Sequence, residues 1–143
     1  MNKNELVSIW RPIESMPNEL LDLQYLNFEG DTLTIILSGK NKGYKFKFHD
    51  MIVGMGSYKY TSLNSNFEFS ETFKTWINIC HLGSEVYSLF RKFDSFYIDC
   101  IKTQSYNAYK DVYHKITHYI FVTCDAVIEV VSMYEPVCIE ISI

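Results

Sequence analysis

Glycine and proline are scarce in this chain: its 143 residues include six glycines and three prolines. Collagen-like and low-complexity proteins are much richer in these residues, and disordered proteins are poorer in apolar ones. Here 48% of the residues are hydrophobic, and 143 residues is a common single-domain length. We therefore expect residues 1–143 to form one domain around its own core.

Long apolar runs are also missing. No stretch approaches the roughly 20 apolar residues of a membrane-spanning helix, and the opening MNKNELV lacks the apolar segment of a secretory signal. The few cysteines, Cys80, Cys100, Cys124 and Cys138, form no CxxC pair, so we expect reduced and mostly buried thiols. These absences predict a soluble, cytoplasmic protein with no membrane contact.

Positive charge is in deficit, with 13 lysines and arginines against 17 acidic residues and no basic run. A net charge of −4 repels a phosphate backbone, so we expect no nucleic-acid partner. His114 and His118 have the spacing of two metal ligands on a helix, but no acid lies between them and His118 opens a strand-like run. We expect ordinary polar contacts here, with no metal and no cofactor.

What the sequence does contain is a period of two, which is typical of half-buried strands. In residues 44–49, Tyr44, Phe46 and Phe48 alternate with Lys45 and Lys47, which gives one apolar and one basic face. Residues 32–38 alternate in the same way, and glycines 39 and 43 lie in the segment between the two runs. Together with flanking runs, they predict an N-terminal antiparallel meander over residues 23–29, 32–38, 44–49 and 52–63.

Helical spacing is weaker and lies in the middle of the chain. Val86, Leu89, Phe90 and Phe93 form a stripe behind a potential cap at Ser84, which predicts a short amphipathic helix over 84–93. Residues 73–80 have similar spacing behind Ser70, and residues 103–115 fit either a helix or a long loop.

The C-terminal part is strand-like again. Residues 118–124 and 127–132 predict a central hairpin, and residues 137–143 alternate as a further, edge strand. No linker or repeat separates the two strand-rich halves. We expect an α+β fold, in which a largely antiparallel sheet carries one or two helices.

Glu129 is the most informative acid, because it lies within the apolar run IEVV. One hypothesis makes it an acid–base or ligand group with Asp125 nearby. The simpler interpretation, which we favour, places Glu129 on a solvated face beside Thr123. Cysteine catalysis by the neighbouring Cys80 and His81 is disfavoured, since adjacent side chains point in different directions.

Three tyrosines at short intervals, Tyr106, Tyr109 and Tyr113, are a candidate partner-binding platform, because tyrosine offers a large surface and a hydroxyl at low entropic cost. Packing in the core explains the same spacing equally well.

The stretch HYIFVTCDAVIEVVSMYEP at residues 118–136 resembles a family of small, uncharacterised bacterial proteins of the immunity type. The strand-like Leu33–Ser38 and the helix-like segment from Ser84 extend the resemblance thinly over most of the chain. It implies a protein partner, a toxin that is bound and neutralised without catalysis through an acidic surface or an aromatic patch. The alternatives are a small enzyme or a ligand- or metal-binding domain with a pocket around His118 and Glu129, and a homo-oligomer that pairs through an edge strand.

Overall fold

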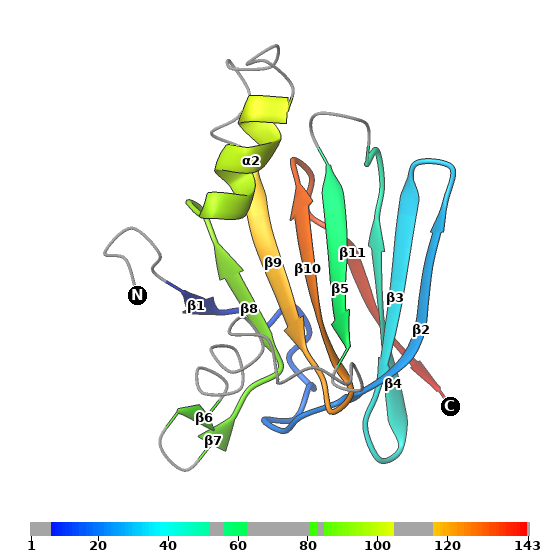
Figure 1. Cartoon of the computed structure of the whole chain (residues 1–143). Coiled ribbons are helices and arrows are strands. Elements are labelled where there is room, and N and C mark those ends of the chain that lie inside the picture. The colour runs from blue at the N-terminus through cyan, green and yellow to red at the C-terminus, as the bar shows by residue number, and fades with distance from the viewer. Residues whose placement is uncertain (1–6, 52–55, 63–80, 83–84, 105–115, 143) are drawn as a thin grey trace.

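The computed structural model describes residues 7–51, 56–62, 81–82, 85–104 and 116–142 (Figure 1). Within these ranges the chain forms two antiparallel sheets, a two-stranded ribbon and one short helix. The fold is essentially all-β, so the predicted α+β class is wrong. The main cause is the predicted helix over 84–93, within which residues 85–86 and 89–92 form strands instead.

The first sheet has four strands in the order β11-β4-β3-β2. Its three consecutive members form the first three strands of the predicted meander, and Gly30 takes the positive φ of 65° that the turn between β2 and β3 requires. The predicted fourth strand over 52–63 is wrongly placed, because residues 57–62 pair in the other sheet. The last strand of the chain then pairs with β4 and closes one edge. The bounds are β2 (Asp22–Glu29), β3 (Thr32–Ser38), β4 (Lys42–Phe48) and β11 (Val137–Ser142).

The second sheet has five strands in the order β1-β8-β9-β10-β5. Its centre is the predicted C-terminal hairpin, whose turn is held by the Thr123 hydroxyl, which donates to the Ala126 carbonyl and accepts from the Ala126 amide. The bounds are β1 (Ser8–Ile9), β5 (Ser57–Ser62), β8 (Leu89–Lys92), β9 (Thr117–Val122) and β10 (Ala126–Ser132); the separate ribbon pairs β6 (His81–Leu82) with β7 (Glu85–Val86).

The two sheets pack face to face around an aromatic core. Trp10, just after β1, sits at its centre, and its ring centroid lies 4.9 Å from Tyr119, 5.7 Å from Phe46 and 5.9 Å from Phe121. Leu33, Ile35 and Leu37 of β3 and Ile128 and Val130 of β10 complete this core. At one edge of the sandwich β2 meets β5, where Phe28 stacks on Tyr58.

The predicted helix over 84–93 is wrong because both faces of β8 are covered. Leu89 points into the core between the sheets, whereas its neighbour Phe90 packs in a second cluster on the opposite face of the five-stranded sheet. Consecutive buried apolar residues on a doubly covered strand imitate helical spacing. Phe93, the last member of the supposed stripe, is 63% exposed.

The helix found among the described residues, α2 (Phe96–Gln104), begins three residues after Phe93 and directly follows Ser95. It lies against the face of the five-stranded sheet that points away from the other sheet, beside β8 and β9 in Figure 1, and buries Ile98 and Ile101 there together with Ile116 and Val131. No helix in the described part of the chain has the length and apolar character needed to cross a membrane. The predicted helical segment 73–80 and most of 103–115 lie outside the described residues.

Candidate functional site

A cluster of buried polar side chains lies between α2 and the five-stranded sheet. His118 of β9 and Glu129 of β10 are diagonal neighbours on adjacent strands, because Glu129 pairs with Ile120 and His118 with Val131. The two side chains therefore point to the same face, and Nε2 of His118 lies 3.0 Å from Oε1 of Glu129. Each residue keeps less than 5% of its surface exposed.

Ser95 connects this pair to the helix. Its hydroxyl lies 2.9 Å from Nδ1 of His118 and accepts the backbone N–H of Ile98 at 3.2 Å, as an N-cap does. The hydroxyl has one proton to give, and Glu129 as a carboxylate can only accept. Ser95 therefore donates to Nδ1, and His118 donates from Nε2 to the carboxylate.

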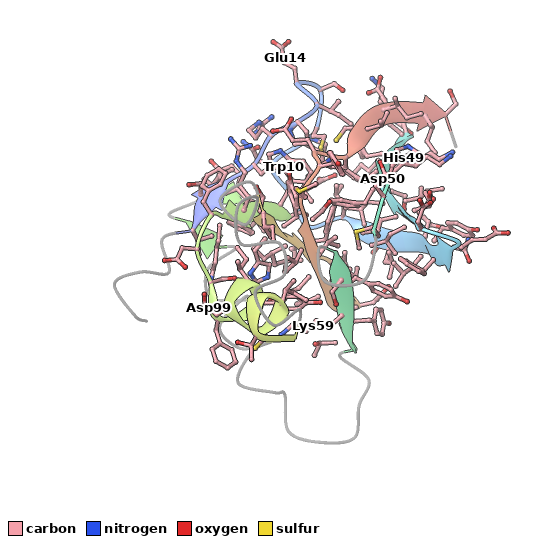
Figure 2. The ribbon with its side chains drawn as sticks, turned by 90° about the horizontal axis from the view of Figure 1, so that it is seen from above. Trp10, Glu14, His49, Asp50, Lys59 and Asp99 are labelled. Carbon is pink, nitrogen blue, oxygen red and sulfur yellow. The ribbon has the colours of Figure 1, made fainter. Side chains whose placement is uncertain are left out.

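Lys59 and Tyr97 close the cluster on the side of β5. The Lys59 ammonium lies 3.5 Å from Oε2 of Glu129, an oxygen without a hydrogen-bond partner among the described residues, and 4.6 Å from the centroid of the Tyr97 ring. Tyr97 donates its hydroxyl to Ser57 at 2.8 Å and meets the His118 ring edge to face. Figure 2 shows Lys59 next to the helix that carries Tyr97.

The charge states follow from these contacts. Burial lowers the pKa of His118 by more than its hydrogen bond to Glu129 raises it, and the nearby positive charges of Lys92 and Lys59 add to the decrease. Burial raises the pKa of Glu129, but the hydrogen bond from His118 and the charge of Lys59 outweigh it and hold that pKa below its usual value. At neutral pH the cluster thus holds a neutral imidazole and an ionised carboxylate.

Serine, histidine and a carboxylate in contact are the parts of a hydrolytic triad, but here the serine is committed to the helix cap. A nucleophile or base must also reach its substrate, and Ser95, His118 and Glu129 are each buried. Three cavities lined by described residues all lie elsewhere. The cluster therefore fastens the start of α2 to the sheet, which is a structural task.

A different feature is open to a partner: the outer face of the four-stranded sheet. Register places six side chains on that face in two neighbouring rows, and we call this set the outer face. The first row holds Tyr25, Ile36, Lys45 and Ile139, and the second holds Lys47 and Val137. Tyr25 is 47%, Ile139 45% and Val137 53% exposed. Contiguous apolar groups at this level of exposure are typical of interaction sites.

The outer face carries positive charge, although the chain as a whole is negatively charged. Lys45 and Lys47 lie in the middle of the sheet, and within the described ranges neither makes an ion pair. Lys42 differs, because its ammonium contacts Glu140 at 3.0 Å. A chain with a net charge of −4 therefore presents two unneutralised cations beside exposed apolar side chains.

Comparisons of the chain with protein-family models, curated proteins and solved structures gave no match. The resemblance to immunity-type proteins stays a prediction.

The structure places the sequence-predicted site residues as follows. It brings His118 and Glu129 together, and our expectation of a solvated Glu129 is wrong because α2 covers that face. Asp125 lies exposed in the hairpin turn. Of the cysteines, Cys124 is exposed and Cys100 and Cys138 are half-buried, so the expected burial is incomplete. Several predicted residues lie outside the described ranges: Tyr106, Tyr109, Tyr113, His114 and Cys80.

Sequence reasoning missed Ser95 and the outer face. Ser95 carries a visible signal, since a serine directly before the apolar FYIDCI is a standard start of a helix. Of the outer face, the alternation in residues 44–49 predicted only the basic side chains Lys45 and Lys47. Val137 and Ile139 carry no signal that they join these lysines, because the register between strands decides which way they point.

Proposed function

We propose that the protein is a binding module of the immunity type, acting in the cytoplasm without catalysis, and that the outer face contacts its protein partner. One observation carries the proposal: Tyr25, Val137 and Ile139 expose apolar surface on a regular sheet around Lys45 and Lys47. A rigid sheet face loses little conformational entropy on binding, so such a surface suits protein recognition.

The partner is expected to be a different protein with acidic groups around an apolar centre. Lys45 and Lys47 favour carboxylates opposite them through electrostatic complementarity. A second copy of this chain is a poor occupant, because a two-fold contact through the same face brings the lysines of both copies together. The resemblance to immunity-type proteins supports a toxin as the kind of partner.

Burial of the cluster around His118 supports a binding module over an enzyme. The Ser95 hydroxyl and both ring nitrogens of His118 are engaged in hydrogen bonds within the cluster and at the helix cap.

The test is affinity capture from lysate of the source cells with three baits: the wild-type chain, Ile139→Lys and Phe96→Ser. Ile139→Lys adds a charge in the middle of the outer face, whereas Phe96→Ser changes an apolar side chain that is 75% exposed at the start of α2. The proposal expects one protein to be retained in stoichiometric amount by the wild type and by Phe96→Ser, and lost with Ile139→Lys.

Lysine acetylation of the isolated complex then locates the contact. Lys45 and Lys47 should be protected by the captured protein, while the exposed Lys40, in the turn before β4, stays reactive. Retention by all three baits, full reactivity of Lys45 and Lys47 in the complex, or capture of this chain alone each overturns the proposal. Neutralisation of the captured protein's toxicity on co-expression would support the immunity assignment, and undiminished toxicity would contradict it.

A further inference from the structure

A cavity of about 440 Å³ opens at the edge of the sandwich where β8 faces β11. This is the edge opposite the Phe28–Tyr58 contact, and no residue that lines the cavity belongs to the outer face. Its volume is within the usual range for small-molecule pockets. Seven residues from three separate parts of the chain line it: Trp10, Arg11, Pro12, Arg91, Glu135, Pro136 and Cys138.

Both arginines of the chain line this one cavity. All other cationic side chains of Lys or Arg type are lysines, yet Arg11 and Arg91, which are 80 residues apart in sequence, meet here. Arginine differs from lysine in its planar fork of N–H donors, which matches the two oxygens of a carboxylate. The concentration of this residue type at one place therefore points to oxyanion recognition.

The guanidinium of Arg91 has an unused hydrogen-bond donor. Its Nε is buried and lacks a hydrogen-bond partner within the described part of the chain, and its guanidinium lies 5.4 Å from the centroid of the Phe93 ring. Register places Arg91 on the same face of the sheet as Tyr119, so it points between the two sheets. A buried N–H without an acceptor is costly, and an oxygen atom of a ligand would satisfy it.

Arg11 is held in position before any ligand arrives. Its terminal nitrogens donate to the carbonyl oxygens of Met16 at 2.8 Å and of Glu14 at 3.5 Å, and to the side chain of Asn18. In Figure 2 the segment that ties down Arg11 projects from the body of the protein beyond Trp10, with Glu14 at its tip. A donor fixed in this way loses little entropy when it binds an anion.

The other residues that line the cavity indicate the apolar character and the charge of its ligand. Trp10 and two prolines supply the smaller, apolar part of the exposed walls, and contacts with the aromatic rings of the core hold Trp10 in place. Two arginines and Glu135 leave one net positive charge, and Cys138 adds none, because burial raises its pKa to about 12. One positive charge matches a monoanion better than a dianion such as phosphate.

We propose that this cavity is a binding site for a small organic carboxylate with an aromatic or apolar body, in which Arg11 and Arg91 contact the carboxylate and Trp10 contacts the body. The site is independent of the partner-binding function proposed above.

The full-length protein offers a direct test, because its NMR spectrum contains only two arginine Nε–Hε signals, which Arg11→Lys and Arg91→Lys assign. Titration with phenylacetate should shift both signals and saturate. The uncharged 2-phenylethanol should bind at least about tenfold more weakly, a difference of about 1.4 kcal/mol. Inorganic phosphate, which lacks the apolar body, should also bind more weakly.

Variants separate recognition from stability. Arg91→Gln should weaken phenylacetate binding at least about tenfold, and Arg91→Lys, which keeps the charge but loses the fork, should fall between Arg91→Gln and the wild type. The matched control Lys40→Gln removes an exposed cation from the turn before β4, away from this cavity, and should leave binding unchanged. Phenylacetate that shifts neither signal at millimolar concentration, or that binds no better than 2-phenylethanol, overturns the proposal. If Arg91→Gln fails to fold, the wild-type titration and Arg91→Lys still decide it.

Discussion

Nε2 of His118 and Oε1 of Glu129 lie 3.0 Å apart in a region from which solvent is almost excluded. The pair holds one negative charge, since the imidazole is neutral and the carboxylate is ionised. Its stability therefore depends on pH and on both partners being present.

Acid should destabilise the protein in a window set by His118. The folded-state pKa of His118 lies below its ordinary 6.5 and that of Glu129 below its ordinary 4.5. In both cases the unfolded chain binds a proton more readily, so the free energy of unfolding falls as pH falls, from about 6.5 for His118 and from about 4.5 for Glu129. One group contributes a slope of at most about 1.4 kcal/mol per pH unit. Urea unfolding at pH 5, 6, 7 and 8 measures it.

The matched variant is His118→Gln, which should remove the loss of stability between pH 6.5 and 5. The three other histidines of the chain remain in that variant. An unchanged pH profile in His118→Gln would assign the loss to one of them instead and contradict the prediction.

Removal of Glu129 should be far more costly than removal of Glu140. Both carboxylates contact a lysine on a neighbouring strand, Lys59 and Lys42 respectively, but Glu129 is buried and Glu140 lies at the surface. Glu129→Ala leaves the Nε2–H of His118 without an acceptor and opens space, for which we expect a loss of about 2–4 kcal/mol. Chemical denaturation at pH 7 measures it.

Glu140→Ala serves as the control and should have only a small effect, because exposed ion pairs contribute little. Equal losses in the two variants would mean that solvent reaches Glu129.

The burial of Glu129 also shows what sequence can and cannot predict. The alternation in β3 and β4 correctly assigned the inward and outward side chains, because one face of that sheet is covered and the other is solvated. In β10 every residue is buried. A strand covered on both faces has no alternation to detect, and its cover comes from α2, which is distant in sequence from β10.

β11 shows a second limit. Its alternation of Val137 and Ile139 with Cys138 was recognised, and an apolar face is normally taken to be the buried one. Pairing with β4 reverses this, since Cys138 lies opposite the core residue Phe46. Register across the sheet decides the direction of each side chain, and a single strand's pattern does not contain it.

The Ser95 cap should be measurable as local helix stability. Ser95→Ala removes the acceptor for the Ile98 amide and the donor to His118, so we expect a loss of about 1–2 kcal/mol. Hydrogen exchange should accelerate over Phe96–Gln104 more than in β10. Thr103→Ala is the control, because Thr103 is exposed and its hydroxyl only donates to the Asp99 carbonyl within the same helix. Protection of α2 that is equal in Ser95→Ala and Thr103→Ala would rule out the cap.

Trp10 should be the costliest aromatic side chain to remove, because it joins the two sheets. It contacts Phe46 from the four-stranded sheet and Tyr119 and Phe121 from the five-stranded sheet, although it belongs to a segment that follows the two-residue strand β1. Trp10→Ala removes these contacts and leaves a cavity that rigid strands cannot fill by collapse, which typically costs about 3–5 kcal/mol. Equilibrium unfolding in urea gives the value.

Phe96→Ala is the appropriate comparison for Trp10→Ala. Phe96 is also aromatic, but it is 75% exposed, so its truncation should change the free energy of unfolding by no more than about 0.5 kcal/mol. If Trp10→Ala were as mild as Phe96→Ala, the segment around β1 would not be part of the folded core, and the cavity formed by Trp10, Arg11 and Arg91 would lose its wall. The Trp10 measurement therefore tests the sandwich and the geometry of the proposed carboxylate site together.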